Sequence, residues 1–161
     1  MAHKTELDAV DRKLLRLLAT DGRSSYQALA DEVGLSRPAV MERVKRLEEA
    51  RYISGYGARV DRGKAGFPVT AFVAVRYASS DYVGDEPRMR EMEKHPGVLE
   101  CHHVAGEDCY ILKVAAPDLE RLQDLLRDLR GPSPSVEMST RTTIVLGTVF
   151  EKPGFVPTEL D

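Results

Sequence analysis

The stretch Gly34-Leu35-Ser36-Arg37-Pro38-Ala39-Val40-Met41-Glu42-Arg43-Val44-Lys45-Arg46-Leu47-Glu48-Glu49 decides the fold of the first part of the chain. Ser36 can cap a helix, and Pro38 falls in its first turn, where a missing backbone N–H costs little. An apolar stripe at helical spacing is formed by Val40, Val44 and Leu47. The pattern therefore predicts a helix that docks through this stripe and presents arginine side chains on its other faces.

A second, shorter helical pattern ends directly before this stretch. It covers residues 26–33, with Ser24 and Gln27 predicted to form a capping box at its start and Gly34 at its end. Because so short a turn joins the two helices, they cross steeply, as in a helix-turn-helix motif that offers its second helix to a DNA groove. The alternative is an αα corner that only packs a core, but packing alone does not need a basic exposed face.

Three more segments complete the first half of the chain. A helix from about Asp8 to Ala19 is predicted by the apolar spacing of Val10, Leu14, Leu17 and Leu18. Residues 52–60 are rich in β-formers and glycine, which predicts an extended strand or a small wing. A linker over residues 61–68 is indicated by Gly63, Gly66 and Pro68. We therefore predict that residues 1–60 form a winged helix-turn-helix domain.

Strand and helix patterns alternate beyond the linker. Strands are predicted over residues 69–77, 98–104, 109–115 and 139–150. Helices are predicted from Pro87 to Lys94 and after Pro117-Asp118, where one side carries Leu119, Leu122, Leu125, Leu126 and Leu129. This β-α-β-β-α-β order over residues 69–150 is that of the ferredoxin-like split unit, which makes the fold class α+β and leaves residues 151–161 as a tail. Helices on one sheet face leave the other open, so we expect a homodimer.

The charge of the chain is unevenly divided. Residues 1–64 hold 13 Lys and Arg against 10 Asp and Glu, a balance of +3, whereas the balance of residues 65–161 is −6. The basic surplus thus lies in the half with the helix-turn-helix, and phosphate binding depends on local charge. No transmembrane run or signal-peptide pattern is present, so we expect a cytoplasmic protein without a membrane partner. Cys101 and Cys109 are expected to be reduced thiols.

The second helix of the motif supplies the best candidates for contacts with double-stranded DNA. Arg37 and Arg43 suit base edges, whereas Lys45 and Arg46 suit phosphates. The alternative for Arg43 and Arg46 is pairing with Glu42 or Glu49 on a solvated face. Backbone N–H groups at the start of the preceding helix can also bind phosphate. The predicted DNA-binding residues are Arg23, Ser24, Ser25, Ser36, Arg37, Pro38, Ala39, Met41, Glu42, Arg43, Lys45 and Arg46.

The loop Ala105-Gly106-Glu107-Asp108 offers backbone N–H groups and carboxylates near the end of the sheet. These groups suit the carboxylate and the ammonium of a zwitterion, although a plain β-turn is the alternative. Strand alternation places His102 on the opposite face from Cys101 and His103, so no metal site is predicted. We find no nucleophile–base pair, phosphate loop or cofactor fingerprint, and we predict a protein that is not an enzyme and has no cofactor.

Several runs along residues 7–150 resemble the leucine-responsive / asparagine-synthase-regulator (Lrp/AsnC) family of transcription factors. The matching runs are Leu7-Asp8, Asp11-Arg12-Lys13-Leu14-Leu15, Leu29-Ala30-Asp31-Glu32-Val33-Gly34-Leu35-Ser36, Arg43-Val44-Lys45-Arg46-Leu47-Glu48-Glu49, Ile53-Ser54-Gly55-Tyr56 and Glu100-Cys101-His102-His103-Val104-Ala105-Gly106. Cys109 stands where the family usually has an acid, with Asp108 one place earlier, and Ala50-Arg51 replaces the family's usual glycine after the recognition helix, which we expect only to stiffen the exit.

The resemblance implies a C-terminal regulation-of-amino-acid-metabolism (RAM) domain. Such domains pair into dimers that often assemble into tetramers or octamers, and amino-acid effectors bind between subunits near the loop after the second strand. To the loop over residues 105–108, the position in the family pattern adds His103, Cys109, Leu119, Thr143 and Ile144. The expected effector-binding residues are therefore His103, Val104, Ala105, Gly106, Glu107, Asp108, Cys109, Leu119, Thr143 and Ile144.

The leading hypothesis is a sequence-specific DNA-binding transcriptional regulator whose oligomeric RAM domain senses an amino acid. Because a dimer carries two reading helices, its operator should be roughly palindromic, with half-sites one helical turn or a multiple of it apart. The alternative is a small-molecule-sensing oligomer whose N-terminal module binds protein instead of DNA. A ferredoxin-like enzyme is a third class, for which no chemical motif is found.

Overall fold

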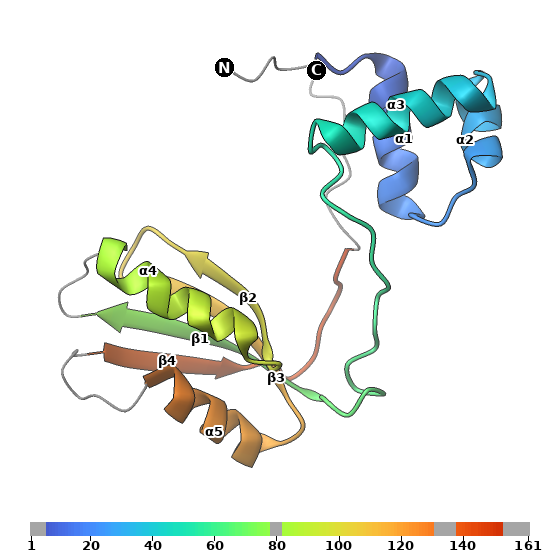
Figure 1. The fold of residues 1–161 in the computed structure, drawn as a ribbon. Coiled ribbons are helices and arrows are strands. Elements are labelled where there is room, and N and C mark those ends of the chain that lie inside the picture. Colours follow the sequence, from blue (N-terminus) through green and yellow to red (C-terminus); the bar gives the residue numbers. More distant parts are fainter. Residues whose placement is uncertain (1–5, 78–81, 131–137, 153–161) are drawn as a thin grey trace. The chain divides into compact units, whose positions relative to one another are not determined.

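The computed structural model describes residues 6–77, 82–130 and 138–152 of the 161-residue chain. The chain divides into two compact units, residues 1–59 with 150–161 and residues 60–149, and each unit is considered by itself. Figure 1 shows a helical unit in the first part of the chain and a four-stranded sheet with helices in the second.

The helical unit consists of α1 (Ala9–Thr20), α2 (Tyr26–Val33) and α3 (Arg37–Glu49). The predicted apolar stripe of α3 is confirmed, because its three side chains lie in the core of the unit. That core contains Leu14, Leu15, Leu29, Ala30, Val40, Val44 and Leu47. Burial of each α3 side chain in this set stabilises the unit by about 1.5–3 kcal/mol. This is enough to hold a short helix that is only marginally stable in isolation.

The turn between α2 and α3 has the predicted caps. Gly34 adopts φ +69°, the left-handed conformation that glycine enters without a Cβ penalty, and it closes α2. The Ser36 hydroxyl accepts a hydrogen bond from the backbone N–H of Ala39 at 3.4 Å and opens α3, with Pro38 in the first turn. The two helices thus form the predicted helix-turn-helix.

The predicted capping box of α2 is wrong by one residue. Ser25 is the cap, and its hydroxyl accepts from the backbone N–H of Ala28 at 3.1 Å. The Ser24 hydroxyl instead donates to Asp21, and the Gln27 amide donates to Asp31. Because α2 begins at Tyr26, the third helical position falls on Ala28, which has no side chain for a reciprocal bond. A capping box is present on α1, between Asp8 and Asp11.

The predicted strand or wing over residues 52–60 is not formed. Residues 51–68 contain turns and irregular backbone but no strand. The N–H groups of Arg51 and Tyr52 close α3 by donating to the carbonyls of Glu48 and Leu47. A lone extended segment needs a neighbouring strand to pair its backbone, and the helical unit of one chain provides none among its described residues.

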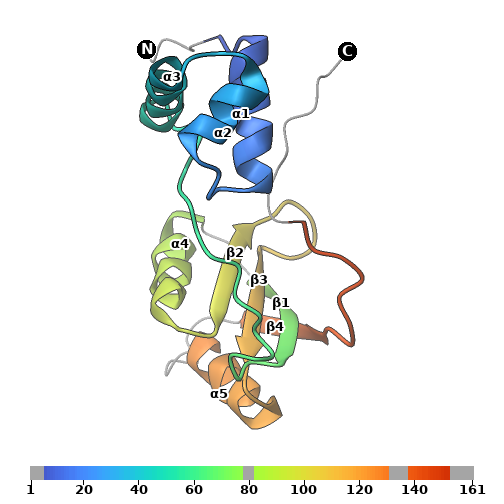
Figure 2. The same cartoon turned by 90° about the vertical axis from the view of Figure 1, so that its right-hand side faces the viewer.

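The second unit has the predicted β-α-β-β-α-β order. Its elements are β1 (Val69–Tyr77), α4 (Tyr82–Glu91) with a turn of 3-10 helix (Met92–Lys94), β2 (Val98–His103), β3 (Tyr110–Ala116), α5 (Leu119–Arg130) and β4 (Met138–Ile144). The sheet order is β2-β3-β1-β4, and every described neighbour pair is antiparallel. Figure 2 shows the β2–β3 loop at one end of the sheet and the first turn of α5 at the other. The ferredoxin-like α+β prediction is therefore confirmed.

Two element boundaries differ from the predictions by more than one residue. Helix α4 begins at Tyr82 and carries Pro87 inside it, whereas the predicted helix begins at Pro87. Residues 78–81 lie outside the described part. Strand β4 ends at Ile144 instead of continuing to residue 150. The last backbone bond joins the N–H of Val145 to the carbonyl of Thr70, where β1 begins, so the chain beyond has no strand beside it.

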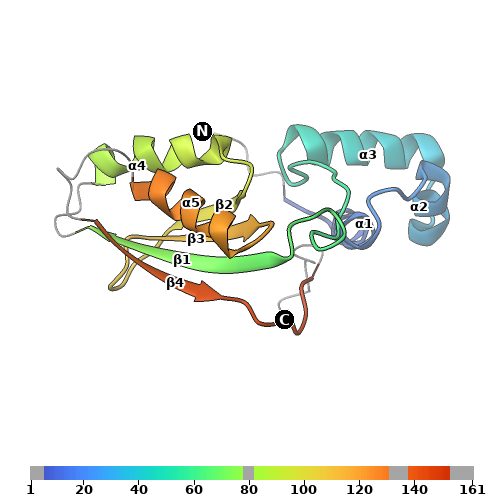
Figure 3. The same cartoon turned by 90° about the horizontal axis from the view of Figure 1, so that it is seen from below.

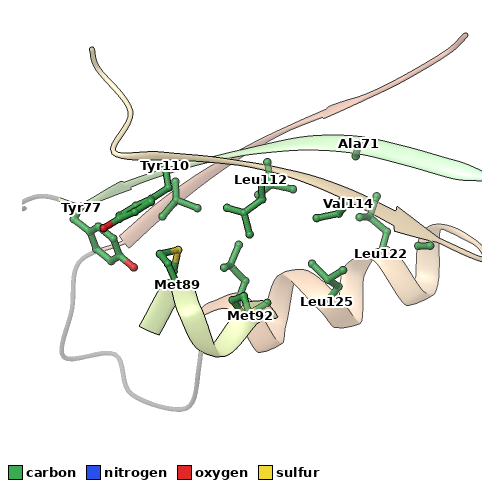
Figure 4. Packing of buried hydrophobic residues seen from close by; sticks show 13 residues of the cluster. Ala71, Tyr77, Met89, Met92, Tyr110, Leu112, Val114, Leu122 and Leu125 are labelled. Carbon is green, nitrogen blue, oxygen red and sulfur yellow. The ribbon is translucent and has the colours of Figure 1, made fainter. Parts of the chain in front are cut away.

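Both helices cover one face of the sheet, as Figure 3 shows. Alternate side chains of β1 and β3 point into this layer and meet leucines of α5 and two methionines, Met89 and Met92 (Figure 4). The rings of Tyr77 and Tyr110 pack edge to face with centroids 6.4 Å apart. The opposite sheet face has no helix, and Phe72 on the central strand β1 remains 43% exposed there.

Candidate nucleic-acid interface and effector site

The outer side of α3 carries a stripe of exposed side chains. Arg37, Met41 and Lys45 recur at four-residue spacing, so they share one face of the helix, and all three are exposed. Arg37 makes no side-chain hydrogen bond or ion pair within the described part of the chain. Lys45 lies 3.7 Å from Glu49, in a solvated pair of the kind that contributes little. This face can therefore offer its charges to a phosphate or a base edge.

Arg43 and Arg46 lie on a different face of α3, turned toward the first turn of α1. Nη1 of Arg43 lies 2.6 Å from Oδ2 of Asp8 and 2.9 Å from Oδ1 of Asp11. Nη2 of Arg46 lies 2.7 Å from Oδ2 of Asp11. The alternative that both arginines form ion pairs is thus confirmed, but the predicted partners are wrong. The carboxylates belong to Asp8 and Asp11 at the start of α1 and not to Glu42 or Glu49.

Burial makes this cluster unlike the surface ion pairs elsewhere in the chain. Asp11 is 1% exposed, whereas the side chains of Arg43 and Arg46 are 27% and 46% exposed. The carboxylate of Asp11 also accepts from the backbone N–H of Asp8 at 3.3 Å. A charge taken out of water is tolerated only when it is paired and hydrogen-bonded, and Asp11 meets that condition through Arg43 and Arg46.

The protonation equilibria of the cluster follow its contacts. The backbone N–H of Asp11, and then the guanidinium of Arg43, hold the pKa of Asp8 below its ordinary value. Hydrogen bonds to Asp8 and Asp11 raise the pKa of Arg43. Two carboxylates and two guanidiniums give the cluster no net charge, so it adds nothing to the attraction of the unit for a polyanion.

The other predicted DNA-binding residues lie at the two helix starts. Arg23 is exposed, and its backbone N–H donates to Asp21. The hydroxyls of Ser25 and Ser36 are engaged as helix caps, while Ser24 bonds to Asp21. Pro38 and Glu42 are exposed and Ala39 is half-buried on α3. Arg37, Pro38, Met41, Glu42 and Lys45 therefore lie together on the accessible side of one helix.

The predicted effector loop closes the β2–β3 hairpin. The N–H of Val104 donates to the carbonyl of Cys109 at 3.0 Å, and Gly106 adopts φ +148°, a conformation that favours glycine. Ala105, Gly106 and Glu107 are exposed. The Asp108 carboxylate lies 2.9 Å from Nη2 of Arg141 on β4, a partner that the sequence did not indicate.

The predicted effector residues do not meet within one chain. His103 to Cys109 lie beside Tyr110, which pairs with Val75, at one end of the sheet. Leu119 follows Ala116, which pairs with Val69, at the other end, and Ile144 pairs with Ala71 near it. Thr143 pairs with Phe72 and faces the uncovered side. Strands of this length span roughly 20 Å, so a small ligand cannot touch both ends of one sheet.

The cysteines and histidines of the hairpin give no sign of reactive chemistry. Among the described residues, no three His, Cys, Asp or Glu side chains come together in an arrangement that could hold a metal ion. Cys101 is exposed, but partial desolvation by its neighbours raises the pKa of its thiol, which disfavours the nucleophilic thiolate at neutral pH. The ring of His103 packs against Tyr110 with centroids 5.1 Å apart.

In the described part of the chain, no helix combines the length and apolarity required to cross a bilayer.

The fold and the exposed basic helix define a helix-turn-helix regulator joined to an α+β ligand-binding domain. An AsnC-type helix-turn-helix domain model matches residues 7–48, and an Lrp/AsnC ligand binding domain model matches residues 70–155. The chain belongs to the Lrp/AsnC family of transcriptional regulators.

Similar proteins share this architecture along almost their whole length. The HTH-type transcriptional regulator LrpA of Mycobacterium tuberculosis is 38% identical over 152 residues, which are 94% of this chain and 97% of LrpA. The Bkd operon transcriptional regulator of Pseudomonas aeruginosa is 39% identical over 134 residues, 81% of this chain and 86% of that protein. A feast or famine regulatory protein from M. tuberculosis, solved in complex with L-methionine, superposes with a TM-score of 0.83 at 36% identity, covering 94% of this chain and all of that one.

Proposed function

We propose that this regulator binds a palindromic DNA operator through the outer face of α3, in an oligomer whose affinity for DNA responds to an amino acid. The observation that carries the DNA-binding part is the stripe Arg37, Met41 and Lys45, which is exposed on a helix whose apolar side chains are buried. Arginine and lysine on an accessible helix suit the base edges and phosphates of the major groove. We also propose that the protein acts in the cytoplasm as a regulator without an enzymatic step.

We propose that the chain forms a homodimer through the uncovered sheet face. Phe72 lies at the centre of that face, beside Ile111 and Ala74, with the Lys113–Glu100 and Arg141–Asp108 pairs around it. An apolar centre ringed by paired charges suits self-association about a two-fold axis. A dimer would then carry two copies of α3, and further association to tetramers or octamers is part of the proposal.

The effector site is proposed to lie between subunits. Loop residues 103–109 of one copy and Leu119 or Ile144 of another can meet around a ligand, although they lie at opposite ends of one sheet. Exposed N–H groups near Gly106 suit a carboxylate, and Glu107 suits an ammonium. The L-methionine complex of the M. tuberculosis protein supports an amino acid as the ligand class.

The DNA-binding part is tested by selecting random duplexes on the intact protein at low salt. We expect an inverted repeat whose half-site centres lie about 10.5 base pairs apart, or a multiple of that spacing. A retained pool without sequence preference, or no retention at all, would contradict sequence-specific binding.

The effector part is tested by a thermal-shift screen of the twenty amino acids. A ligand that binds the folded oligomer raises the unfolding temperature, and one at about 100 times its Kd stabilises by about 2.7 kcal/mol. We expect at least one amino acid to raise the unfolding temperature and to change the affinity for the selected duplex. If none of the twenty amino acids changed the unfolding temperature at millimolar concentration, amino-acid sensing would be refuted. The proposed DNA binding would be unaffected.

A further inference from the structure

We propose that Asp11 is a positioning residue of the DNA-binding surface, whose buried carboxylate keeps Arg43 and Arg46 on α1 both in the free protein and on DNA. On this view the two arginines set the orientation of α3 and make no phosphate contact. The inference rests on the proposed DNA binding, and it removes Arg43 and Arg46 from the DNA contacts expected from the sequence.

The contacts of Asp11 are complete in the free protein. Its two carboxylate oxygens accept from Arg43 at 2.9 Å, from Arg46 at 2.7 Å and from the backbone N–H of Asp8 at 3.3 Å. Asp11 is 1% exposed with both guanidiniums in place, so its carboxylate depends on them for its charged partners. A phosphate that drew both arginines away would break a buried ion cluster, and removing the partners of a buried charge is strongly destabilising.

We call Asp11, Arg43 and Arg46 the clamp. It fixes α3 by a face of the helix that the apolar stripe does not use. Arg43 and Arg46 are three residues apart and so lie one above the other on the side that meets α1. Val40, Val44 and Leu47 hold the core side. Two such contacts on different faces prevent rotation of the helix about its axis, and they leave Arg37, Met41 and Lys45 pointing outward.

Asp8 adds a second carboxylate to Arg43 that is accessible to solvent. It lies 2.6 Å from Nη1 of Arg43, and its side chain is 50% exposed. Asp8 also accepts from the backbone N–H of Asp11 at 2.7 Å, which ties the clamp to the start of α1. Arg43 therefore meets two carboxylates on α1, which leaves it little to gain from a phosphate.

Salt dependence of DNA binding separates a positioning arginine from a contacting one. Each phosphate contact contributes about 0.9 to the slope of log K against log salt concentration, whereas a structural role contributes nothing to it. The probe is a random-sequence duplex of about 40 base pairs, or roughly four helical turns, and the protein is the full chain. The variants are Arg43→Gln and Arg46→Gln, with Arg37→Gln as the contacting reference.

We expect Arg43→Gln and Arg46→Gln to keep the wild-type slope but to unfold at least about 4 °C lower. Arg37→Gln should keep the wild-type unfolding temperature and lose about 0.9 from the slope. A loss of about 0.9 in either clamp variant would overturn the inference. A wild-type protein that binds no duplex would instead refute the proposed DNA binding, so the two failures are distinguishable.

A triple variant keeps the test decisive if a clamp variant fails to fold. Asp11→Leu combined with Arg43→Met and Arg46→Met replaces the buried charges by apolar groups, a change that is often neutral or stabilising for a buried ion cluster. We expect this variant to fold and to bind the random duplex with the wild-type slope. A slope reduced by about twice 0.9 would show that both arginines contact phosphate and would overturn the inference.

Discussion

Oδ2 of Asp11 lies 2.7 Å from Nη2 of Arg46, which joins the first turn of α1 to the last turn of α3. The pair couples two helices that are 35 residues apart in sequence, and one of its members is buried. Asp11→Asn removes the charge while it keeps the shape. We expect it to lower the free energy of unfolding by about 3 kcal/mol, at the low end for a broken buried pair because both guanidiniums still touch water.

Urea unfolding measures this loss, with Asp124→Asn as the matched control. Asp124 pairs with Arg121 and Arg127 on the exposed side of α5, and its removal should cost about 0.5 kcal/mol or less. Equal midpoints for Asp11→Asn and the wild type would show that the cluster does not stabilise the helical unit.

Asp8 predicts how the helical unit responds to acid. Its folded pKa lies below the ordinary value of 3.8, so it contributes stability that is fully present above that pH and is lost as pH falls through the lower folded value. Asp8→Asn keeps a capping side chain but cannot titrate. As the pH is lowered from about 5 to 2, the unfolding temperature should therefore fall less steeply in Asp8→Asn than in the wild type. Parallel curves would contradict the lowered pKa.

Arg51 occupies a backbone position that favours glycine. Its φ is +61°, and it follows the end of α3 where its N–H and that of Tyr52 close the helix. Arg51→Gly should raise the free energy of unfolding by about 0.5–1 kcal/mol, because it removes a strained Cβ. Arg51→Ala is the control, since it shortens the side chain but keeps the Cβ, and its urea midpoint should not rise. A higher urea midpoint in both variants would mean that the Arg51 side chain, and not its backbone conformation, destabilises the wild type.

Phe72 tests the proposed dimer face. Phe72→Glu places a charge at the centre of the uncovered sheet face, where a second copy would have to bury it. We expect sedimentation to show dissociation to monomers and duplex affinity to fall with it. Gln123→Glu adds the same charge to the exposed side of α5 and should leave the particle size unchanged. An oligomer that survives Phe72→Glu would place the interface elsewhere.

The sequence predicted what local patterns control. The stripe of Val40, Val44 and Leu47 and the caps at Gly34 and Ser36 follow from spacing within a few residues, and the structure has them. The cap of α2 was assigned to Ser24 instead of Ser25, because adjacent serines offer the same chemistry and only the backbone conformation decides between them.

Partners that are far apart in the sequence could not be predicted from such local spacing. Arg43 and Arg46 meet carboxylates more than thirty residues earlier in the chain, and the only signal in the sequence was the spacing of Asp8 and Asp11 on the first helix. Asp108 likewise meets Arg141, 33 residues later. Leu119 and Ile144 were expected at the effector site only from the family pattern, whereas the loop over residues 105–108 was expected from its own chemistry. One chain holds these two groups at opposite ends of its sheet, where no local rule could bring them together.

The outward stripe of α3, formed by Arg37, Met41 and Lys45, is the proposed DNA-binding surface. Its most direct test is the salt dependence of fluorescence anisotropy for a labelled duplex with the wild type and with the double variant Arg37→Gln, Lys45→Gln. Arg121→Gln, Arg127→Gln removes the same charge from α5 and serves as the control. We expect a slope of log K against log salt concentration that is reduced by about twice 0.9 in the α3 variant and unchanged in the control. Equal slopes in all three proteins, or no binding by the wild type at low salt, would contradict it.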